Sequence, residues 1–288
     1  MSALGSELLR RVRDNLRDGA SHLARVALDV LAEFATNEPA ADAAELQTHL
    51  LDFADELCGQ RPSMTAIHNL VARWRDGVAE FDGGIDALRD YAADQARAVR
   101  SWADGATDAT VRAAMNRIPP GSRIFTHSRS STVSEVLRRM AGPNISVIVT
   151  ESRPGLEGWN LAASLAGQGT AVTYITDAQA GLFVGEADLI LLGADSILRD
   201  GALVNKAGTR LIALAAREAG VPVLVCAESF KCTGLAVAEV ELEEKSGSEL
   251  RPPPVPGVRA RNIYFEVTPR ALISEYISNE PLAERFTT

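Results

Sequence analysis

The stretch LILLGADSILRDGALVNKAGT, residues 189–209, decides how the second half of this chain folds. It begins with four apolar residues, Leu189–Leu192, a pattern typical of a strand buried on both faces of a sheet. The apolar pattern stops at Asp195, so a carboxylate follows directly on a segment that is expected to be buried. Asn205 and Lys206 come later in the same stretch. Polar groups at the end of a buried strand indicate a binding or catalytic site.

The chain on either side of this stretch, from residue 119 onwards, alternates short β-type runs with helical patterns. Patterns typical of helices occupy residues 132–140 and 209–220, and a polar, proline-rich loop is expected at 243–258. Apolar strands joined by helices predict a parallel sheet with helices on both faces, so the fold class is α/β. The β-type runs occupy residues 123–128, 145–150, 171–176, 188–195, 221–226 and 262–267.

The first part of the chain, from about residue 4 to residue 118, has a purely helical pattern. Apolar residues recur there at steps of three and four, and turn-forming residues interrupt the pattern at four places. We therefore predict a helical N-terminal domain over residues 1–118 and an α/β domain over residues 119–288.

Composition excludes several classes of protein. At 288 residues, 46% apolar and 23% charged, the chain is typical of a soluble protein, and its apolar runs fall short of the roughly 18–20 residues of a membrane span. A net charge of −9 argues against binding to nucleic acid or to an anionic membrane. The three cysteines lack the CxxC spacing of a metal site, and no signal peptide is evident. We expect a cytoplasmic protein without a metal or cofactor.

Lysine is scarce in this chain. Of the 29 basic residues only three are lysines, Lys206, Lys231 and Lys245. Lys206 and Lys231 lie just after strand-like segments, where a compact ammonium group is well placed to meet an anion.

Polar residues follow four of the strand patterns, and the carboxyl ends of parallel strands meet at one edge of a sheet. Each also has a purely structural interpretation: Ser130 can cap the next helix, His127 can be a packed histidine, and Arg153 can pair with Glu157. These residues are His127, Ser128 and Ser130 after the first strand, Glu151 and Arg153 after the second, Asp195 after the fourth, and Glu228 and Lys231 after the fifth.

Phosphate recognition is expected at the start of the helix that begins near Thr209. The sequence contains neither GxxxxGK[ST] nor a GxGxxG motif that opens a helix, which excludes the common nucleotide-binding loops. The segment Asn205–Thr209, NKAGT, would instead present free backbone N–H groups together with Lys206. These groups predict a site for a single phosphate.

The residues at these strand ends resemble a known family. The segment 193–231, which begins GADSILRDGALVNKAGT and ends ESFK, is similar to the core of the initiation factor 2B alpha/beta/delta family, which includes ribose-1,5-bisphosphate isomerase and methylthioribose-1-phosphate isomerase. The resemblance extends to RPSM, THSRSSTVSEVL, TESRPGLEG and YFEVTPRALIS. It implies a Rossmann-like C-terminal domain through which the chain forms a homodimer or a higher homo-oligomer, and a sugar-phosphate pocket at the junction of the domains.

The resemblance also implies roles for individual residues. It makes Asp195 a catalytic acid or base, with Asn205, Lys206 and Lys231 holding the substrate. Arg61 then contacts a phosphate. The predicted substrate-binding residues also include Gly19 and Ala20 in the N-terminal phosphate loop, and Ser130 and Arg153 at the strand ends.

Two positions depart from the family pattern. Ser128 stands where the isomerases carry a catalytic cysteine, and a serine hydroxyl titrates far above a thiol. Asp18 stands where an arginine faces phosphate, so Arg17 would have to reach that place. Both changes weaken the isomerase interpretation.

Two hypotheses follow. In the first, the chain is an initiation factor 2B-like subunit that binds a phosphorylated sugar or a nucleoside monophosphate and contacts initiation factor 2. In the second, it is an aldose-phosphate to ketose-phosphate isomerase in which Asp195 acts with His127 or Glu151 in place of the thiol. Loss of the cysteine favours the first hypothesis, and retention of the other site residues favours the second.

Overall fold

The computed structural model describes residues 2–15, 19–62, 64–282 and 285–286. The chain divides into two compact units, residues 1–106 and residues 107–288. The division falls inside α5, Ile85–Met115, because the last turns of this helix pack with the second unit. The domain boundary expected at residue 118 marks the change from a helical to a strand pattern, and it stays a prediction.

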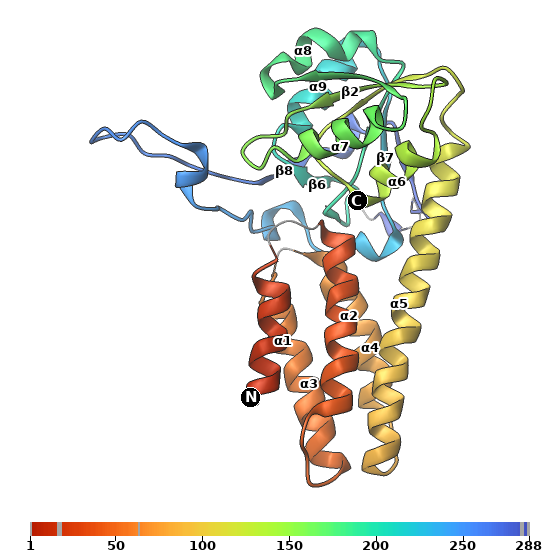
Figure 1. Ribbon diagram of the computed structural model, residues 1–288, viewed down its shortest axis with the longest axis vertical. Coiled ribbons are helices and arrows are strands. Elements are labelled where there is room, and N and C mark those ends of the chain that lie inside the picture. The colour runs from red at the N-terminus through yellow and green to blue at the C-terminus, as the bar shows by residue number, and fades with distance from the viewer. Residues whose placement is uncertain (1, 16–18, 63, 283–284, 287–288) are drawn as a thin grey trace. The chain divides into compact units, whose positions relative to one another are not determined.

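The first unit is built from helices, as the sequence predicts. Its core includes a stacked pair, Phe34 and Phe53, with ring centroids 3.9 Å apart. Trp74 is fully buried and its indole N–H donates to the carbonyl of Ala92 over 2.8 Å, so the largest apolar side chain leaves no donor unpaired. The helices are α1, Ala3–Arg13; α2, Ala20–Asn37; α3, Ala43–Gly59; α4, Thr65–Ala79; and the part of α5 up to residue 106 (Figure 1).

The second unit contains a six-stranded parallel sheet in the order β3-β2-β1-β4-β7-β9. Counted along the chain within this sheet the order is 3-2-1-4-5-6, which is that of a Rossmann-like fold. The α/β class and the Rossmann-like sheet predicted from the sequence are confirmed. The strands are β1, Arg123–Thr126; β2, Ser146–Thr150; β3, Ala171–Ile175; β4, Leu189–Leu192; β7, Val223–Cys226; and β9, Glu275–Ile277.

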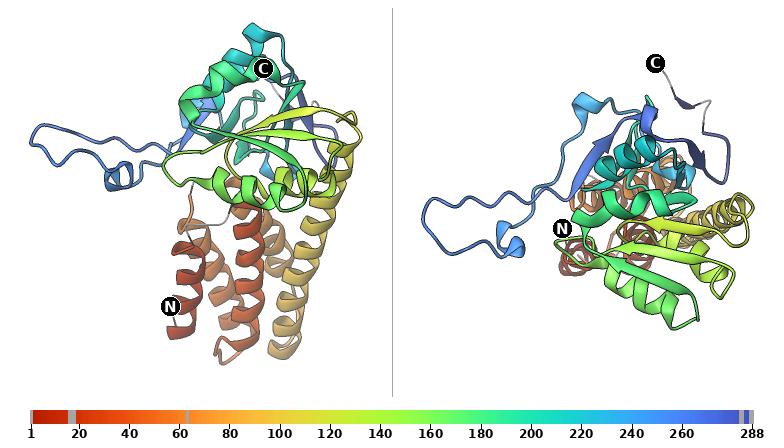
Figure 2. Two further views of the ribbon diagram at one scale, coloured as in Figure 1. Left: turned by 45° about the horizontal axis from the view of Figure 1, so that its top comes forward. Right: turned by 90° about the horizontal axis from the view of Figure 1, so that it is seen from above.

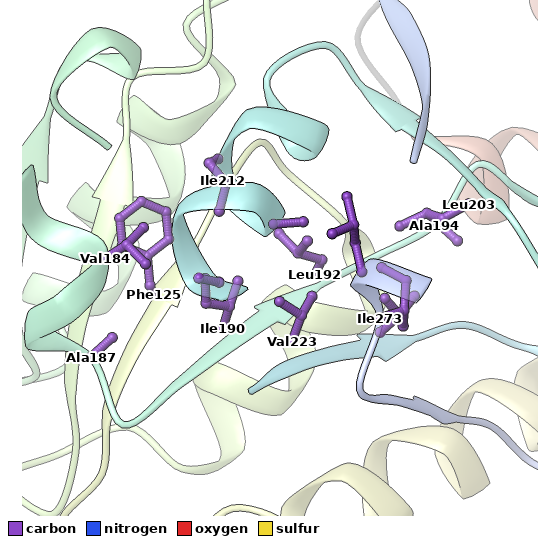
Figure 3. Close-up of a cluster of buried hydrophobic side chains, with 14 of the residues drawn as sticks. Phe125, Val184, Ala187, Ile190, Leu192, Ala194, Leu203, Ile212, Val223 and Ile273 are labelled. Carbon is purple, nitrogen blue, oxygen red and sulfur yellow. The ribbon is translucent and has the colours of Figure 1, made fainter. Parts of the chain in front are cut away.

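Helices cover both faces of this sheet. On one face α8, Ala180–Phe183, and α9, Thr209–Ala219, pack over Phe125, Ile190 and Val223 (Figure 3). On the other face α6, Ser131–Arg139, and α7, Glu157–Ala166, pack with the end of α5 (Figure 1). Double burial explains why β4 and β7 are apolar runs without alternation.

A second, three-stranded antiparallel sheet carries the rest of the opening stretch. It contains β5, Ser196–Ile197, β6, Leu203–Lys206, and β8, Phe265–Thr268, in that order. The run at residues 262–267, grouped by sequence with the parallel strands, therefore belongs to this sheet. An apolar run does not specify its partner, and β6 supplies the open edge that β8 pairs with.

The proline-rich loop expected at residues 243–258 forms a long arm between β7 and β8. The arm extends away from both sheets and is the blue hairpin-like excursion in Figure 2. A bridge between Glu244 and Ile263 helps to join its two sides, and Arg261 pairs with Glu244 over 2.8 Å at the same level.

The packing of α7 on β2 generates a test of the fold. A Cβ atom at Gly158 would lie 1.8 Å from the carbonyl oxygen of Thr150, so Gly158→Ala must displace α7 or β2. We expect a loss of at least about 2 kcal/mol in the free energy of unfolding. Gly181→Ala is the matched control, because nothing lies within 4 Å of a Cβ there and alanine favours the helix.

Urea denaturation of the two variants and the parent chain measures both effects. Gly181→Ala should equal or slightly exceed the stability of the parent. Equal stability of Gly158→Ala and Gly181→Ala would contradict the close approach of α7 to β2.

Candidate functional site

The polar segments picked out by the sequence lie at the carboxyl edge of the parallel sheet. The direction of strand order reverses between β1 and β4, and ligands of doubly wound folds bind at such a switch point. His127 and Ser128 follow β1, and Asp195 follows β4. Lys231 lies in a 3₁₀ turn, Ser229–Lys231, just after β7.

Asp195 is held at the end of β4 by the small sheet. Its backbone N–H donates to the carbonyl of Val204 over 2.9 Å, and β5 starts at the next residue. Burial raises the pKa of its carboxyl to about 6 from an ordinary value of 3.8, although the ammonium groups of Lys231 and Lys206 act in the opposite direction. Asp195 is therefore a carboxyl group that can gain or lose a proton near neutral pH.

Lys206 lies at the end of β6 and is only 3% exposed. Its ammonium nitrogen is 2.6 Å from Oε1 of Glu157 and 4.0 Å from the centroid of the Tyr264 ring. The other carboxylate oxygen of Glu157 is buried and has no hydrogen-bond partner among the described residues. The ammonium of Lys206 is thus fixed between an anion and an aromatic face, and an acceptor stays open beside it.

Asn205 orients the loop that follows β6. Its side-chain amide donates to Oγ1 of Thr209 over 3.0 Å, and that hydroxyl donates to the carbonyl of Lys206 over 2.6 Å. These two bonds close the turn between β6 and α9. Asn205 is 7% exposed and has a structural role beside any contact with a ligand.

The helix N-terminus at NKAGT, expected to be free, has two of its backbone N–H groups already engaged, and a phosphate site at this segment stays a prediction. Oε1 of Glu266 accepts hydrogen bonds from the backbone N–H groups of Gly208, over 2.6 Å, and Arg210, over 2.9 Å. A carboxylate from β8 occupies the place that a phosphate oxygen would take. Sequence spacing could not reveal this contact, because Glu266 comes 58 residues after Gly208.

His127 is a packed histidine, which was the structural interpretation. Nε2 lies 2.9 Å from the carbonyl oxygen of Ala207, which can only accept, so Nε2 carries the proton. Nδ1 then accepts from the Thr150 hydroxyl over 2.6 Å. Burial lowers the pKa of His127, so the ring is neutral with both nitrogens engaged. It is not placed to replace a catalytic thiolate.

Ser128 and Ser130 lie in the segment between β1 and α6. Ser128 has a φ of 65°, an uncommon conformation for a residue with a side chain, and its N–H donates to Oγ of Ser152 over 2.7 Å. Ser130 caps α6 by accepting from the N–H of Val133 over 3.3 Å, as its structural interpretation required. It also lies against Gly193, where a Cβ would be 2.4 Å from the Cβ of Ser130.

Arg153 is exposed, and Glu151 is half-buried. The N–H of Arg153 donates to Asp177 over 2.7 Å, which fixes the backbone of this turn but not the guanidinium. The described partner of Glu157 is Lys206, the contact that sequence reasoning missed when it considered Arg153 for this pair.

Three predicted phosphate contacts belong to the first unit. Arg61 is 6% exposed, and its guanidinium donates to the carbonyl groups of Val12 and Asn15 at the end of α1. Gly19 is the N-cap of α2, and Ala20 is its first residue. Arg17 and Asp18, at the departure from the family loop, lie outside the described residues. A shared site of these residues with Lys206 stays a prediction.

Two further searches cover the described residues. Among them, no group of three or more histidine, cysteine, aspartate or glutamate side chains is arranged to hold a metal ion. Within the same ranges, no helix is long and apolar enough to cross a membrane.

Comparison with known proteins agrees with this fold. The model of the Initiation factor 2 subunit family, IF-2B, matches residues 16–282. The chain belongs to this family. It is 33% identical over 279 residues to ribose 1,5-bisphosphate isomerase of Archaeoglobus fulgidus, which covers 94% of this chain and 87% of the relative.

Two relatives from Pyrococcus horikoshii carry factor names. The chain is 35% identical over 276 residues to a putative translation initiation factor eIF-2B subunit 2-like protein, which covers 93% of this chain and 94% of the relative. The crystal structure of the translation initiation factor eIF-2B of that organism has a TM-score of 0.83 and 32% identity, and covers 97% of this chain and 96% of the other. The IF-2B family thus includes similar factors and similar isomerases.

The raised pKa of Asp195 predicts how its removal changes stability. The pKa of the folded state, about 6, lies above the ordinary value of 3.8. Ionisation of this carboxyl therefore costs the parent little stability below about pH 4, and the free energy of unfolding falls as the pH rises through about 6. Asp195→Asn removes this half-buried charge. The variant should be more stable than the parent at pH 8, by at most about 3 kcal/mol.

Urea denaturation at about pH 4 and pH 8 checks the difference. This advantage should nearly vanish at the lower pH, where the folded parent carboxyl is protonated and the unfolded one is only partly ionised. A parent chain as stable as Asp195→Asn at pH 8 would show that burial does not disfavour the carboxylate.

Proposed function

We propose that this protein is an initiation factor 2B-like subunit that binds a phosphorylated sugar or a nucleoside monophosphate and regulates translation initiation in the cytoplasm. Initiation factor 2 is its proposed partner. The observation that carries the proposal is the pair of buried lysines, Lys206 and Lys231, whose charges both act on the carboxyl of Asp195.

Buried ammonium groups support the binding of a small anion. Each lysine is 3% exposed, so its ammonium group has little bound water to lose when it forms a hydrogen bond to a phosphate. The net charge of −9 disfavours long-range attraction of polyanions, so a small and locally held ligand is the proposal.

The scarcity of proton-transfer groups supports binding without turnover. Aldose–ketose isomerisation moves a proton between adjacent carbons and needs a base as well as an acid. Asp195 can fill one role at a time, Ser128 replaces the family cysteine, and His127 has both ring nitrogens engaged.

Isothermal titration with ribose 5-phosphate and adenosine monophosphate tests the binding site. Lys206→Met and Lys231→Met should each weaken binding of the preferred ligand by about 10-fold or more, because a charge-assisted hydrogen bond is lost. Lys245→Met is the control, because Lys245 pairs with Glu243, 2.7 Å away on the arm, and its ammonium lies farther from the Tyr264 ring, at 5.7 Å, than that of Lys206, at 4.0 Å. Unchanged affinity in both site variants, with each folded by circular dichroism, would reject the assignment.

The isomerase hypothesis is kept as a second candidate because the pKa of Asp195, about 6, suits an acid–base group. The binding proposal expects no appreciable conversion of ribose 1,5-bisphosphate to a ketose, and at most a trace in Ser128→Cys. Conversion at ordinary enzymatic rates by the parent chain, lost in Asp195→Asn, would establish the isomerase instead. Carbon-13 NMR of the sugar follows both outcomes directly.

A homodimer formed through the α/β unit is also proposed, because closed two-fold pairing is the commonest assembly of like chains. Light scattering at micromolar concentration should give twice the 30.7 kDa chain mass. A mass equal to one chain would reject the dimer.

A further inference from the structure

Glu228 is a buried carboxylate at the end of β7 to which the family resemblance gives no role. Its side chain is 0% exposed, and Lys231, three residues later, is 3% exposed. Oε2 of Glu228 lies 3.2 Å from the ammonium nitrogen of Lys231. The two form a nearly dry ion pair directly beside the proposed ligand site.

Two hydroxyl groups fix the other oxygen of this carboxylate. Oε1 accepts from Thr132 on α6 over 2.7 Å and from Thr107 on α5 over 2.8 Å. Burial alone would raise the pKa of Glu228, but the ammonium of Lys231 and the hydroxyl of Thr132 reverse this and lower it to about 2. The carboxylate is therefore ionised, and residues from three different elements hold it in place.

The backbone between the two residues is also fixed. The N–H of Lys231 donates to the carbonyl of Glu228 over 2.9 Å and closes the 3₁₀ turn. Asn279 supports the same turn, because its Oδ1 accepts from the N–H of Ser229 over 2.8 Å and its Nδ2 donates to the hydroxyl of Ser229 over 3.1 Å. The pair is thus anchored at both its backbone and its carboxylate.

The ammonium of Lys231 faces three titratable groups. Glu228 is its close partner. Its positive charge also acts to lower the pKa of the Asp195 carboxyl and of the buried Cys226 thiol on β7. Burial raises the pKa of that thiol, so Cys226 stays neutral and the two carboxylates are the anions that face Lys231.

A lysine side chain has four rotatable bonds, and fixing them costs conformational entropy. A buried ammonium without a partner also favours its neutral form, which cannot bind a phosphate as a cation. The contacts of Glu228 meet both requirements before any ligand arrives. Preorganised charge of this kind makes a binding site effective.

We propose that Glu228 is the positioning residue of the site: it holds the ammonium of Lys231 in place and in its charged form, facing Asp195. The proposal deepens the proposed function, since it assumes that Lys231 meets an anion. The first half of the proposal, that Glu228 holds the ammonium of Lys231 in place and charged, can be measured without any ligand.

The three lysines of the chain make this measurement direct. Lysine labelled with carbon-13 at Cε gives three side-chain signals, which Lys206→Arg, Lys231→Arg and Lys245→Arg assign. In Glu228→Gln the titration midpoint of the Lys231 signal should move down by at least about one pH unit, while the Lys206 and Lys245 signals keep theirs. An unchanged Lys231 midpoint in the folded variant would overturn the proposal.

Glu243→Gln is the matched control, because Glu243 pairs with Lys245 over 2.7 Å on the arm, outside the site. It should leave the Lys231 signal and the affinity for ribose 5-phosphate at parent values. Glu228→Gln should weaken that affinity about 10-fold, with the loss growing as the pH rises. A midpoint shift without any change in affinity would overturn the ligand half of the proposal.

Glu228→Asp keeps the charge and covers the case in which Glu228→Gln does not fold. The shorter side chain moves the carboxylate back by one methylene, so the Lys231 midpoint should stay near the parent value while affinity falls about 3-fold or more. Parent affinity in Glu228→Asp would overturn positioning by Glu228. If the parent binds none of the phosphates, the proposed function fails, while the midpoint shift still decides the first half.

Discussion

Charge compensation at the carboxyl edge of the parallel sheet is the constraint on which this site depends. A buried charge is tolerated only with a partner of opposite sign, and removing one partner leaves the other desolvated and unpaired. Lys206 lies against Glu157, Lys231 lies against Glu228, and Asp195 faces both lysines. Lys206 comes from β6, Glu157 from α7, Lys231 from the 3₁₀ turn after β7, Glu228 from the end of β7 and Asp195 from the end of β4. The site therefore forms only when these elements pack together.

The sum of these charges explains what the site is suited to do. Two ammonium groups and three carboxylates give a net charge of −1 when all are ionised, which does not favour a phosphate dianion. Asp195, with a pKa of about 6, is the member closest to neutrality, whereas Glu228 stays ionised. The cluster therefore admits an anion most readily when Asp195 takes up a proton. A single protonatable carboxyl such as Asp195 is enough for anion binding, but it supplies only half of the acid–base pair that isomerisation needs.

The sequence predicted the elements better than their partners. Alternating strand and helix patterns and the apolar run at Leu189–Leu192 predicted the parallel sheet, because doubly buried strands need continuous apolar residues. Motif spacing likewise placed Asp195 and Lys231 at one edge. Spacing could not show that β8 leaves the parallel sheet, or that Glu266 closes the start of α9. Both depend on contacts between residues far apart in the chain, and a single sequence does not record such contacts.

Calorimetric titration of ribose 5-phosphate at pH 7, in two buffers of different ionisation enthalpy, tests the central claim most directly. A phosphate dianion beside Asp195 raises the pKa of its carboxyl further, so binding should take up a proton from the buffer. The observed enthalpy should then differ between the buffers, and the difference should disappear in Asp195→Asn. Equal enthalpies for the parent chain in both buffers, with binding intact, would show that the anion enters without protonating Asp195 and would contradict this account.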